Sequence, residues 1–212
     1  MQALDDIRVL DFSHVIAGPF STFYLAQMGA QVTKVENPVG GDVMRQSKEG
    51  ARTFTAFNDG KDCVEIDIAS EVGRAQAQAL ARECDVFVNN YRPGTLERYG
   101  LGYEAVKAVN PRVIYCAISG YGYVKPELSA RGAYDHVIQA LTGMAMLTGN
   151  EGDPPIKVGF PVVDVTTGIL GALAILTAVR ERDRHGSGCF LDVSMWAAAL
   201  QPVNDLRPRR TQ

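Results

Sequence analysis

The sequence predicts an α/β protein built on an open, mostly parallel sheet with helices on both faces. Short apolar runs of strand length alternate with longer segments of helical periodicity along almost the whole chain. The short runs are continuously apolar, which is typical of parallel strands that are covered on both faces. A chain of 212 residues, 46% of them hydrophobic, is long enough to form one such domain.

The first part of the chain predicts a β-α-β unit followed by a further strand. Residues 7–12 (IRVLDF) and 31–36 (QVTKVE) have the composition of strands, and between them Gly and Pro signals bound a helix over 18–29. A loop rich in Gly and Asn is expected over residues 37–60. The run at 63–68 (CVEIDI) predicts the third strand.

The alternation of strands and helices continues to residue 195, and right-handed crossovers are expected between the parallel strands. Ser70 is a suitable cap for the next helix, and Pro111 stops the following one. The remaining elements are expected as a helix over 70–83, a strand over 85–90, a helix over 102–110, a strand over 112–119, a helix over 133–146, a long helix after Asp164 and a strand over 189–195.

Residues 1–200 are expected to form one domain, and residues 201–212 a tail outside it. The end of the chain, VNDLRPRRTQ, has no helical or strand periodicity and finishes with basic residues. Such an end is typical of a disordered terminus.

Composition argues against several classes of protein. The formal charge of −3 and the lack of a basic stripe argue against nucleic-acid binding. Four widely spaced cysteines without a CxxC pair argue against a metal site and favour a reducing compartment. The most apolar window, 162–179, contains Asp164 and is followed at once by charges, so a buried helix fits better than a membrane span. With no signal peptide visible, we expect a cytoplasmic protein that does not bind membranes.

A ligand site is expected beyond the carboxyl ends of the strands, where open parallel sheets bind their ligands. The segments there include Ser13–Pro19 after the first strand and Asn89–Gly94 after the fourth. They contain neither GxGxxG nor GxxxxGK[ST], so a Rossmann dinucleotide site or a P-loop is not supported. Arg92, Arg98 and the helix start at Gly18 suit a phosphate-bearing ligand, although each arginine alone also fits a solvated surface charge.

Asp164 stands between an apolar run and a long apolar helix, and two interpretations of it stay open. It can cap the helix, because an Asp at a helix start satisfies free backbone N–H groups. It can also serve as a desolvated nucleophile toward an activated acyl group, or as a proton carrier. The triplet Tyr134–Asp135–His136 likewise fits either capping, with His136 on the solvated face, or a hydroxyl and a second carboxylate in the same site as Asp164.

Five longer motifs run through these segments: RVLDFSHVIAGPFSTFYLAQMGAQVTKVENPVGGDVMR, FNDGKDCVEIDI, DVFVNNYRPGTLERYGLGYEAVKAVNPRVIYCAISGYG, AYDHVIQALTGMAMLTG and VVDVTTGILGALAILTAVRERDRHGSGCFLDVSM. Together they resemble family III CoA-transferases (the CaiB/BaiF family), a group that includes formyl-CoA and carnitine-CoA transferases and α-methylacyl-CoA racemases. The resemblance implies a Rossmann-like large domain. Because members of the family are about twice as long, we expect their second, smaller domain to be missing from this chain.

The resemblance also implies roles for individual residues. Asp164 falls on the aspartate that attacks the acyl-CoA thioester, forming a mixed anhydride and then an aspartyl-CoA thioester. The arginines would pair with phosphates of coenzyme A, and the region of Tyr134 would border the thioester. The implied CoA-binding set is Ile16, Ala17, Asn37, Asn90, Tyr91, Arg92, Arg98, Tyr134 and Asp135.

Position 134 bears on the choice between activities. Racemases of the family carry His there, whereas Tyr134 is a poor base near neutral pH, and His136 is expected to point elsewhere on its helix. Ile16 stands where formyl-CoA transferases have Gln, which makes formate or oxalate chemistry less expected. The preferred prediction is a CoA-transferase that uses acyl-CoA and a small carboxylic acid, without a metal, as a homodimer, in a form that is truncated and impaired. An α-methylacyl-CoA racemase-like enzyme and a non-catalytic CoA-binding or dimerisation module remain as alternatives.

Overall fold

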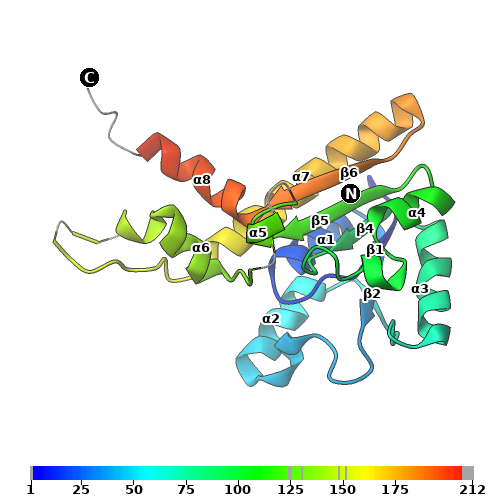
Figure 1. The fold of residues 1–212 in the computed structure, drawn as a ribbon, viewed down its shortest axis with the longest axis horizontal. Helices are drawn as coiled ribbons and strands as arrows, with labels where there is room; N and C mark the ends of the chain where they lie inside the picture. Colours follow the sequence, from blue (N-terminus) through cyan, green and yellow to red (C-terminus); the bar gives the residue numbers. More distant parts are fainter. Residues whose placement is uncertain (1, 124–125, 130, 148, 151, 207–212) are drawn as a thin grey trace.

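Six strands form one sheet in which every neighbouring pair is parallel, in the order β3-β2-β1-β4-β5-β6 (Figure 1). The computed structural model describes residues 2–123, 126–129, 131–147, 149–150 and 152–206. The predicted α/β fold with a parallel sheet is therefore confirmed. The strands are β1 (Arg8–Asp11), β2 (Gln31–Glu36), β3 (Asp62–Glu65), β4 (Val86–Asn89), β5 (Ile114–Ser119) and β6 (Cys189–Ser194).

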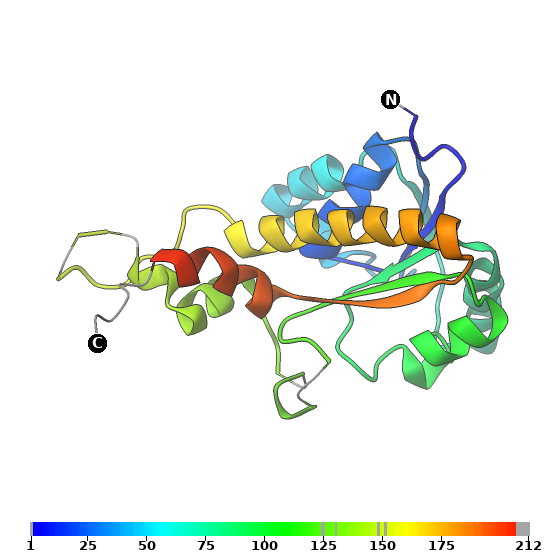
Figure 2. The same ribbon diagram turned by 90° about the horizontal axis from the view of Figure 1, so that it is seen from above.

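Helices cover both faces of the sheet, as the sequence predicts (Figures 1 and 2). One face packs against α1 and α7, and the other packs against α3 and α4. The α-helices are α1 (Ala17–Gln27), α2 (Lys48–Asn58), α3 (Glu71–Glu83), α4 (Tyr103–Val109), α5 (Pro126–Ser129), α6 (Asp135–Thr142), α7 (Val162–His185) and α8 (Met195–Leu206). Three short 3-10 helices are η1 (Val43–Gln46), η2 (Glu97–Tyr99) and η3 (Met144–Met146).

The central strand β4 shows why the apolar runs are so continuous. Val86 and Val88 contribute to the core under α1 and α7, while Phe87 contributes to the core under α3 and α4. All three side chains are fully buried, so neither face of this strand can carry a polar residue facing water. Phe87 also stacks on Phe12 and Tyr115, with ring centroids 5.1 and 4.7 Å apart.

The expected loop over residues 37–60 is wrong, because this segment forms η1 and α2. Asp42 caps η1 by accepting a hydrogen bond from the Met44 amide, and Ser47 caps α2 by accepting one from the Gly50 amide. The helix then packs beside α1, where the rings of Phe20 and Phe57 lie 4.8 Å apart. The Gly and Asn content of the segment concealed these two capping signals.

Helices α6 and α8 lie against each other and extend beyond the sheet from the beginning of α7 (Figure 2). Helix α8 continues to Leu206, so residues 201–206 of the expected disordered tail are helical, and residues 207–212 lie outside the described residues. Among the described residues, α7 alone is long and apolar enough to cross a membrane, with a mean hydropathy of 2.0. In this fold it packs along α1 and the sheet.

Candidate active site

Asp164 lies in the first turn of α7 and does not cap it. The N-cap position belongs to Pro161, which has no side chain able to accept a hydrogen bond. The capping interpretation of Asp164 is therefore wrong. Its half-buried carboxylate lies at the helix start and is left available for chemistry.

The capping role belongs instead to Asp135, the first residue of α6. Its Oδ2 accepts hydrogen bonds from the backbone amides of Val163 and Asp164, at 2.7 and 3.0 Å. Its Oδ1 accepts a hydrogen bond from the side-chain amide of Gln139. Gln139 in turn accepts one from the Val158 amide at 2.8 Å, so the chain leading into α7 is held as well. Asp135 thus fixes the backbone of Asp164 without occupying its carboxylate.

Burial raises the pKa of Asp164 from its ordinary 3.8 to about 7, and the negative charge of Asp135 adds to the rise. Removing water disfavours the charged form of a carboxylate, and a second carboxylate nearby does the same. A carboxylate with a higher pKa is more basic, and its oxygen is a better nucleophile when ionised. At neutral pH a substantial fraction of Asp164 is in that form.

Tyr134 and His136 lie side by side on the exposed surface next to this site. Tyr134 occupies the N-cap position of α6 with its side chain 64% exposed, and His136 is also exposed. Their rings stack with centroids 6.0 Å apart and an interplanar angle of 7°. The expectation that His136 lies on the solvated face is confirmed, but the two rings do not point in different directions.

A second group of predicted residues lies where β1 ends and α1 begins. Asn90 holds the loop between them, because its side chain accepts a hydrogen bond from the His14 amide at 2.9 Å and donates one to the His14 carbonyl at 2.6 Å. The loop leads directly to Ile16, the N-cap residue of α1, and to Ala17, its first residue. Since β1 and β4 are neighbours, the two strand ends meet here.

Helix α7 brings Asp164 to this same region. Gly168 lies one turn after Asp164, and a Cβ added there would stand only 2.8 Å from the carbonyl oxygen of Ala17. A Cβ on Gly171, almost one turn further along, would stand 3.0 Å from the Ser21 hydroxyl. The two glycines therefore allow α1 and α7 to approach closely, which places the beginning of α7 beside the beginning of α1.

A hollow of about 230 Å³ opens beside the loop, between the ends of β1 and β2. Asn37 and Tyr91 line it, together with His14, whose ring meets that of Tyr91 edge-on at 5.0 Å. Burial lowers the pKa of His14, so this imidazole is neutral at physiological pH. The hollow thus presents aromatic and amide groups, which suit a planar polar ligand group.

The two arginines of the predicted set are both exposed but differently placed. The guanidinium of Arg92 lies beside Gly132, where an added Cβ would come within 3.0 Å of it, and Gly132 is two residues before Tyr134. Arg98 lies in η2 and, within the described part of the chain, makes no ion pair or hydrogen bond with the other members of the set. The structure therefore connects Arg92 to the site more directly than Arg98.

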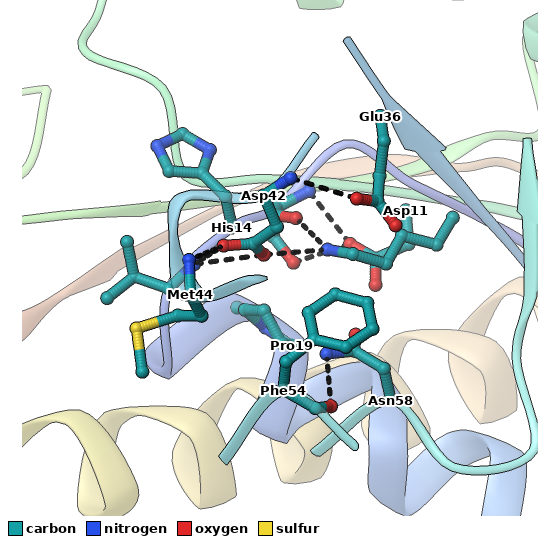
Figure 3. Close-up of polar contacts among 12 residues, drawn as sticks. Asp11, His14, Pro19, Glu36, Asp42, Met44, Phe54 and Asn58 are labelled. Carbon is teal, nitrogen blue, oxygen red and sulfur yellow. Dashed lines mark hydrogen bonds and ion pairs between the residues drawn. The ribbon is translucent and has the colours of Figure 1, made fainter. Parts of the chain in front are cut away.

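A buried network of charged residues supports the β1–α1 loop, and the sequence reasoning missed it (Figure 3). Asp11 and Lys61 form an ion pair at 3.1 Å with both side chains fully buried. Lys61 also donates to the Thr22 hydroxyl and the Pro19 carbonyl, at 2.7 and 2.9 Å. Burial alone would raise the pKa of Asp11. The positive charges of Lys61 and Lys34 and the hydrogen bonds from Ser13 and Thr22 outweigh burial and lower this pKa to about 2.

The same network continues through β2. Lys34 donates to the Ser13 carbonyl at 2.6 Å and pairs with Asp42 at 3.2 Å. Glu36 pairs with Arg45 at 2.8 Å and accepts a hydrogen bond from the Asp42 amide. A lysine within a predicted parallel strand was the available sequence signal, because a buried charge requires a partner.

The described residues contain no group of three or more His, Cys, Asp or Glu side chains that could hold a metal ion. The chemical groups at the site are the half-buried carboxylate of Asp164, the buried carboxylate of Asp135 beside it, the beginning of α1 and a polar hollow nearby. Such a set can attack an electrophilic carbonyl carbon and bind a ligand with several polar parts.

Comparison with known proteins identifies relatives over most of the chain. The family model described as CoA-transferase family III matches residues 4–206. The succinyl-CoA:mesaconate CoA-transferase of Haloarcula hispanica is 40% identical over 208 residues, covering 92% of this chain and 52% of the relative. The succinyl-CoA:glutarate CoA-transferase of Mus musculus is 38% identical over 205 residues, covering 94% of this chain and 47% of the relative.

A solved structure shows the same arrangement of elements. The crystal structure of a CAIB/BAIF family protein from Brucella suis matches with a TM-score of 0.89 and 34% sequence identity. The match covers 97% of this chain and 58% of that protein. The chain thus spans about half the length of the curated relatives it matches.

Proposed function

This chain belongs to CoA-transferase family III, and we propose from that premise that it carries the nucleophile and the CoA site of an enzyme that transfers coenzyme A between carboxylic acids. The observation that supports this best is the state of Asp164. Its backbone is fixed by Asp135, its carboxylate has no hydrogen-bond or ion-pair partner among the described residues, and its pKa is raised to about 7. These are the properties needed by a carboxylate that forms a covalent intermediate.

The proposed reaction exchanges a thioester for an anhydride and back. The Asp164 carboxylate attacks the thioester carbonyl carbon, the C–S bond breaks, and CoA thiolate leaves a mixed anhydride. The thiolate attacks the aspartyl carbonyl of this anhydride, which releases the donor acid and leaves an aspartyl-CoA thioester. The acceptor carboxylate then attacks that thioester, and the thiolate returns to the acceptor carbonyl, which regenerates the Asp164 carboxylate. Each step exchanges acyl groups between oxygen and sulfur, so no ATP is required.

The proposed CoA site runs from the hollow at the end of β2 to the beginning of α7. Asn37 and Tyr91 would bind the nucleotide part in the hollow, and Asn90, which holds the backbone of His14, would orient Ile16 and Ala17 toward the ligand. Arg92 and Arg98 would pair with phosphates, since exposed guanidinium groups bind phosphate oxygens in bidentate fashion. The exposed phenol of Tyr134 would border the thioester, while Asp135 acts through the backbone of Asp164.

The relatives suggest the substrate class. Both named relatives use succinyl-CoA, and their acceptors are mesaconate and glutarate. We therefore propose succinyl-CoA as the donor and a short dicarboxylic acid as the acceptor. Tyr134 argues against the racemase alternative, because a phenol is protonated at neutral pH and cannot take up the α-proton.

The half-length match supports a second candidate, a CoA-binding module without transferase activity. Residues 1–200 would then correspond to the large domain of the family.

A homodimer in a reducing, cytoplasmic compartment is proposed for either case. The dimer is supported by large apolar side chains that are exposed on α7, on η3 and just before α7, among them Leu173 (54%), Met146 (67%) and Phe160 (55%), and the reducing compartment by four free cysteines. Sedimentation analysis would test the dimer.

Intact mass spectrometry after mixing the chain with succinyl-CoA tests the proposed reaction. An active chain forms a covalent acyl or CoA adduct, and hydroxylamine converts the activated aspartyl group to a hydroxamate. Asp164→Asn should abolish both products, whereas Asp183→Asn, an exposed position on the same helix, should retain them. CoA binding without any adduct supports the binding module, and an adduct that persists in Asp164→Asn refutes the assignment of the nucleophile.

A further inference from the structure

The loop between β1 and α1 contains a strained residue. Val15 has a φ of +68°, and among the described residues it is the single non-glycine with a positive φ. A β-branched side chain strongly disfavours this left-handed conformation. Such a residue keeps the conformation only when its surroundings hold it there, and residues of this kind cluster at functional sites.

The carboxylate of Asp42 holds Val15 in place. The Val15 amide donates to both carboxylate oxygens of Asp42, at 3.2 and 3.3 Å. Asp42 is paired with Lys34 at 3.2 Å, and Lys34 donates to the Ser13 carbonyl at 2.6 Å (Figure 3). The ion pair thus holds the loop at two backbone groups, the Ser13 carbonyl and the Val15 amide.

The rest of the loop is held from the other side of the site. Asn90 engages both backbone groups of His14, and Asp11 accepts hydrogen bonds from the amide and hydroxyl of Ser13. The backbone from Ser13 to Val15 therefore has little freedom, and its direction determines where the backbone of Ile16 lies. The strain at Val15 favours a different loop conformation, whereas the contacts of the ion pair favour the observed one.

We propose that Lys34 and Asp42 are a positioning pair, which holds Val15 in the left-handed conformation and so presets Ile16 and Ala17 for coenzyme A. This inference rests on the proposed CoA site. Both residues border the hollow, but each side chain is only 1% exposed, so they act through the loop and not by touching the ligand. Glycine at position 15 would adopt the same φ without strain, which gives the proposal its test.

The test is a double-mutant cycle of Asp42→Asn and Val15→Gly, with CoA affinity measured by titration calorimetry. Asp42→Asn removes the charge that opposes the strain, so the loop relaxes and the binding-competent fraction falls. We expect CoA affinity to drop about tenfold, because apparent affinity scales with that fraction. A chain that already carries Val15→Gly has little strain to release. Adding Asp42→Asn to that chain should therefore lower CoA affinity much less than it does in the unaltered chain.

Asp85→Asn is the matched control. Asp85 pairs with the buried Arg182 at 2.8 Å, at the opposite end of β4 from the loop. This variant should lower thermal stability and leave CoA affinity unchanged. If Asp42→Asn alone does not fold, Lys34→Met combined with Asp42→Asn removes both charges and replaces it in the cycle. An equal loss of affinity with and without the Val15→Gly substitution overturns the proposal, as does an equal loss in Asp85→Asn.

Amide hydrogen exchange in the free protein separates this inference from the proposed function. If the unaltered chain binds no CoA, the proposed CoA site fails, but the positioning pair can still be tested. Residues 13–17 should then exchange about tenfold faster in Asp42→Asn than in Asp85→Asn, because the open fraction of the loop rises. Unchanged exchange in these residues overturns the positioning role, whatever the chain binds.

Discussion

Replacing Asp164 by Asn should remove a specific pH dependence from the stability of the protein. Burial and the charge of Asp135 raise the pKa of Asp164 to about 7, whereas its ordinary value is 3.8. The folded chain therefore binds the Asp164 proton more tightly than the unfolded chain does. Asn has nearly the same shape and cannot ionise, so it isolates this effect from packing.

The sign and size of the effect follow from these two pKa values. Well below pH 3.8 the carboxyl is protonated in both states, and it contributes no pH dependence. As pH rises from 4 to 7, the unfolded chain releases the proton first, so the free energy of unfolding falls. A difference of about three units, at about 1.4 kcal/mol per unit, lowers stability by about 4 kcal/mol.

Urea unfolding followed by circular dichroism, at pH values from 4.5 to 8, measures this contribution. The quantity to compare is the difference in unfolding free energy between Asp164→Asn and the unaltered chain. It should increase with pH and level off above pH 7. Burial lowers the pKa of His14, which gives its contribution the opposite sign, but His14 is present in both proteins and its contribution cancels. Parallel pH profiles for the two proteins would show that Asp164 is not perturbed, and the reasoning would be refuted.

Three further sets of substitutions test other parts of the structure. Asp135→Ala should destabilise the chain by roughly 1–3 kcal/mol in urea unfolding, because it removes the cap of α7. Asp135→Asn should lower the pKa of Asp164, because it removes the neighbouring negative charge. An unchanged pKa of Asp164 in an NMR titration would contradict this coupling of the two charges. Gly168→Ala should lower stability by about 1–3 kcal/mol by forcing α1 and α7 apart, and a neutral effect on the melting temperature would contradict their close approach. Lys61→Met should lower the free energy of unfolding by about 3–5 kcal/mol at pH 7, because it leaves Asp11 charged and without its ion-pair partner. Adding Asp11→Asn should restore part of this lost stability in the same unfolding assay.

Much of the fold could be predicted because its signals are local. The apolar runs at β4 and β5 read as buried strands, and every residue of these two strands is in fact buried. Helices η1 and α2 were missed because their signals are short polar caps, Asp42 for η1 and Ser47 for α2, within a segment whose Gly and Asn content is typical of loops. The amphipathic face of α2 is recognisable only when Phe54 and Phe57 have something to pack against.

The site was only partly predictable, because its residues act through partners distant in sequence. The position of Asp164 between an apolar run and a long apolar helix pointed to a site, and the sheet topology does bring the neighbouring loops together. The capping of α7 by Asp135 spans 29 residues and leaves no local trace. The pairing of Asp11 with Lys61 spans 50 residues, and each charge alone resembles an ordinary polar residue at the edge of a strand or turn.

In the proposed reaction, the raised pKa of Asp164 also constrains whatever covers the site. As the proposed nucleophile, Asp164 must be ionised, yet removing more water would raise its pKa above 7 and lower the ionised fraction at neutral pH. A purely apolar cover would therefore weaken the nucleophile while protecting the anhydride from water. A working cover has to bring hydrogen-bond donors toward the carboxylate, because donors to the charged form lower the pKa. The exposed phenol of Tyr134, one residue before Asp135, is a donor that this chain can supply itself.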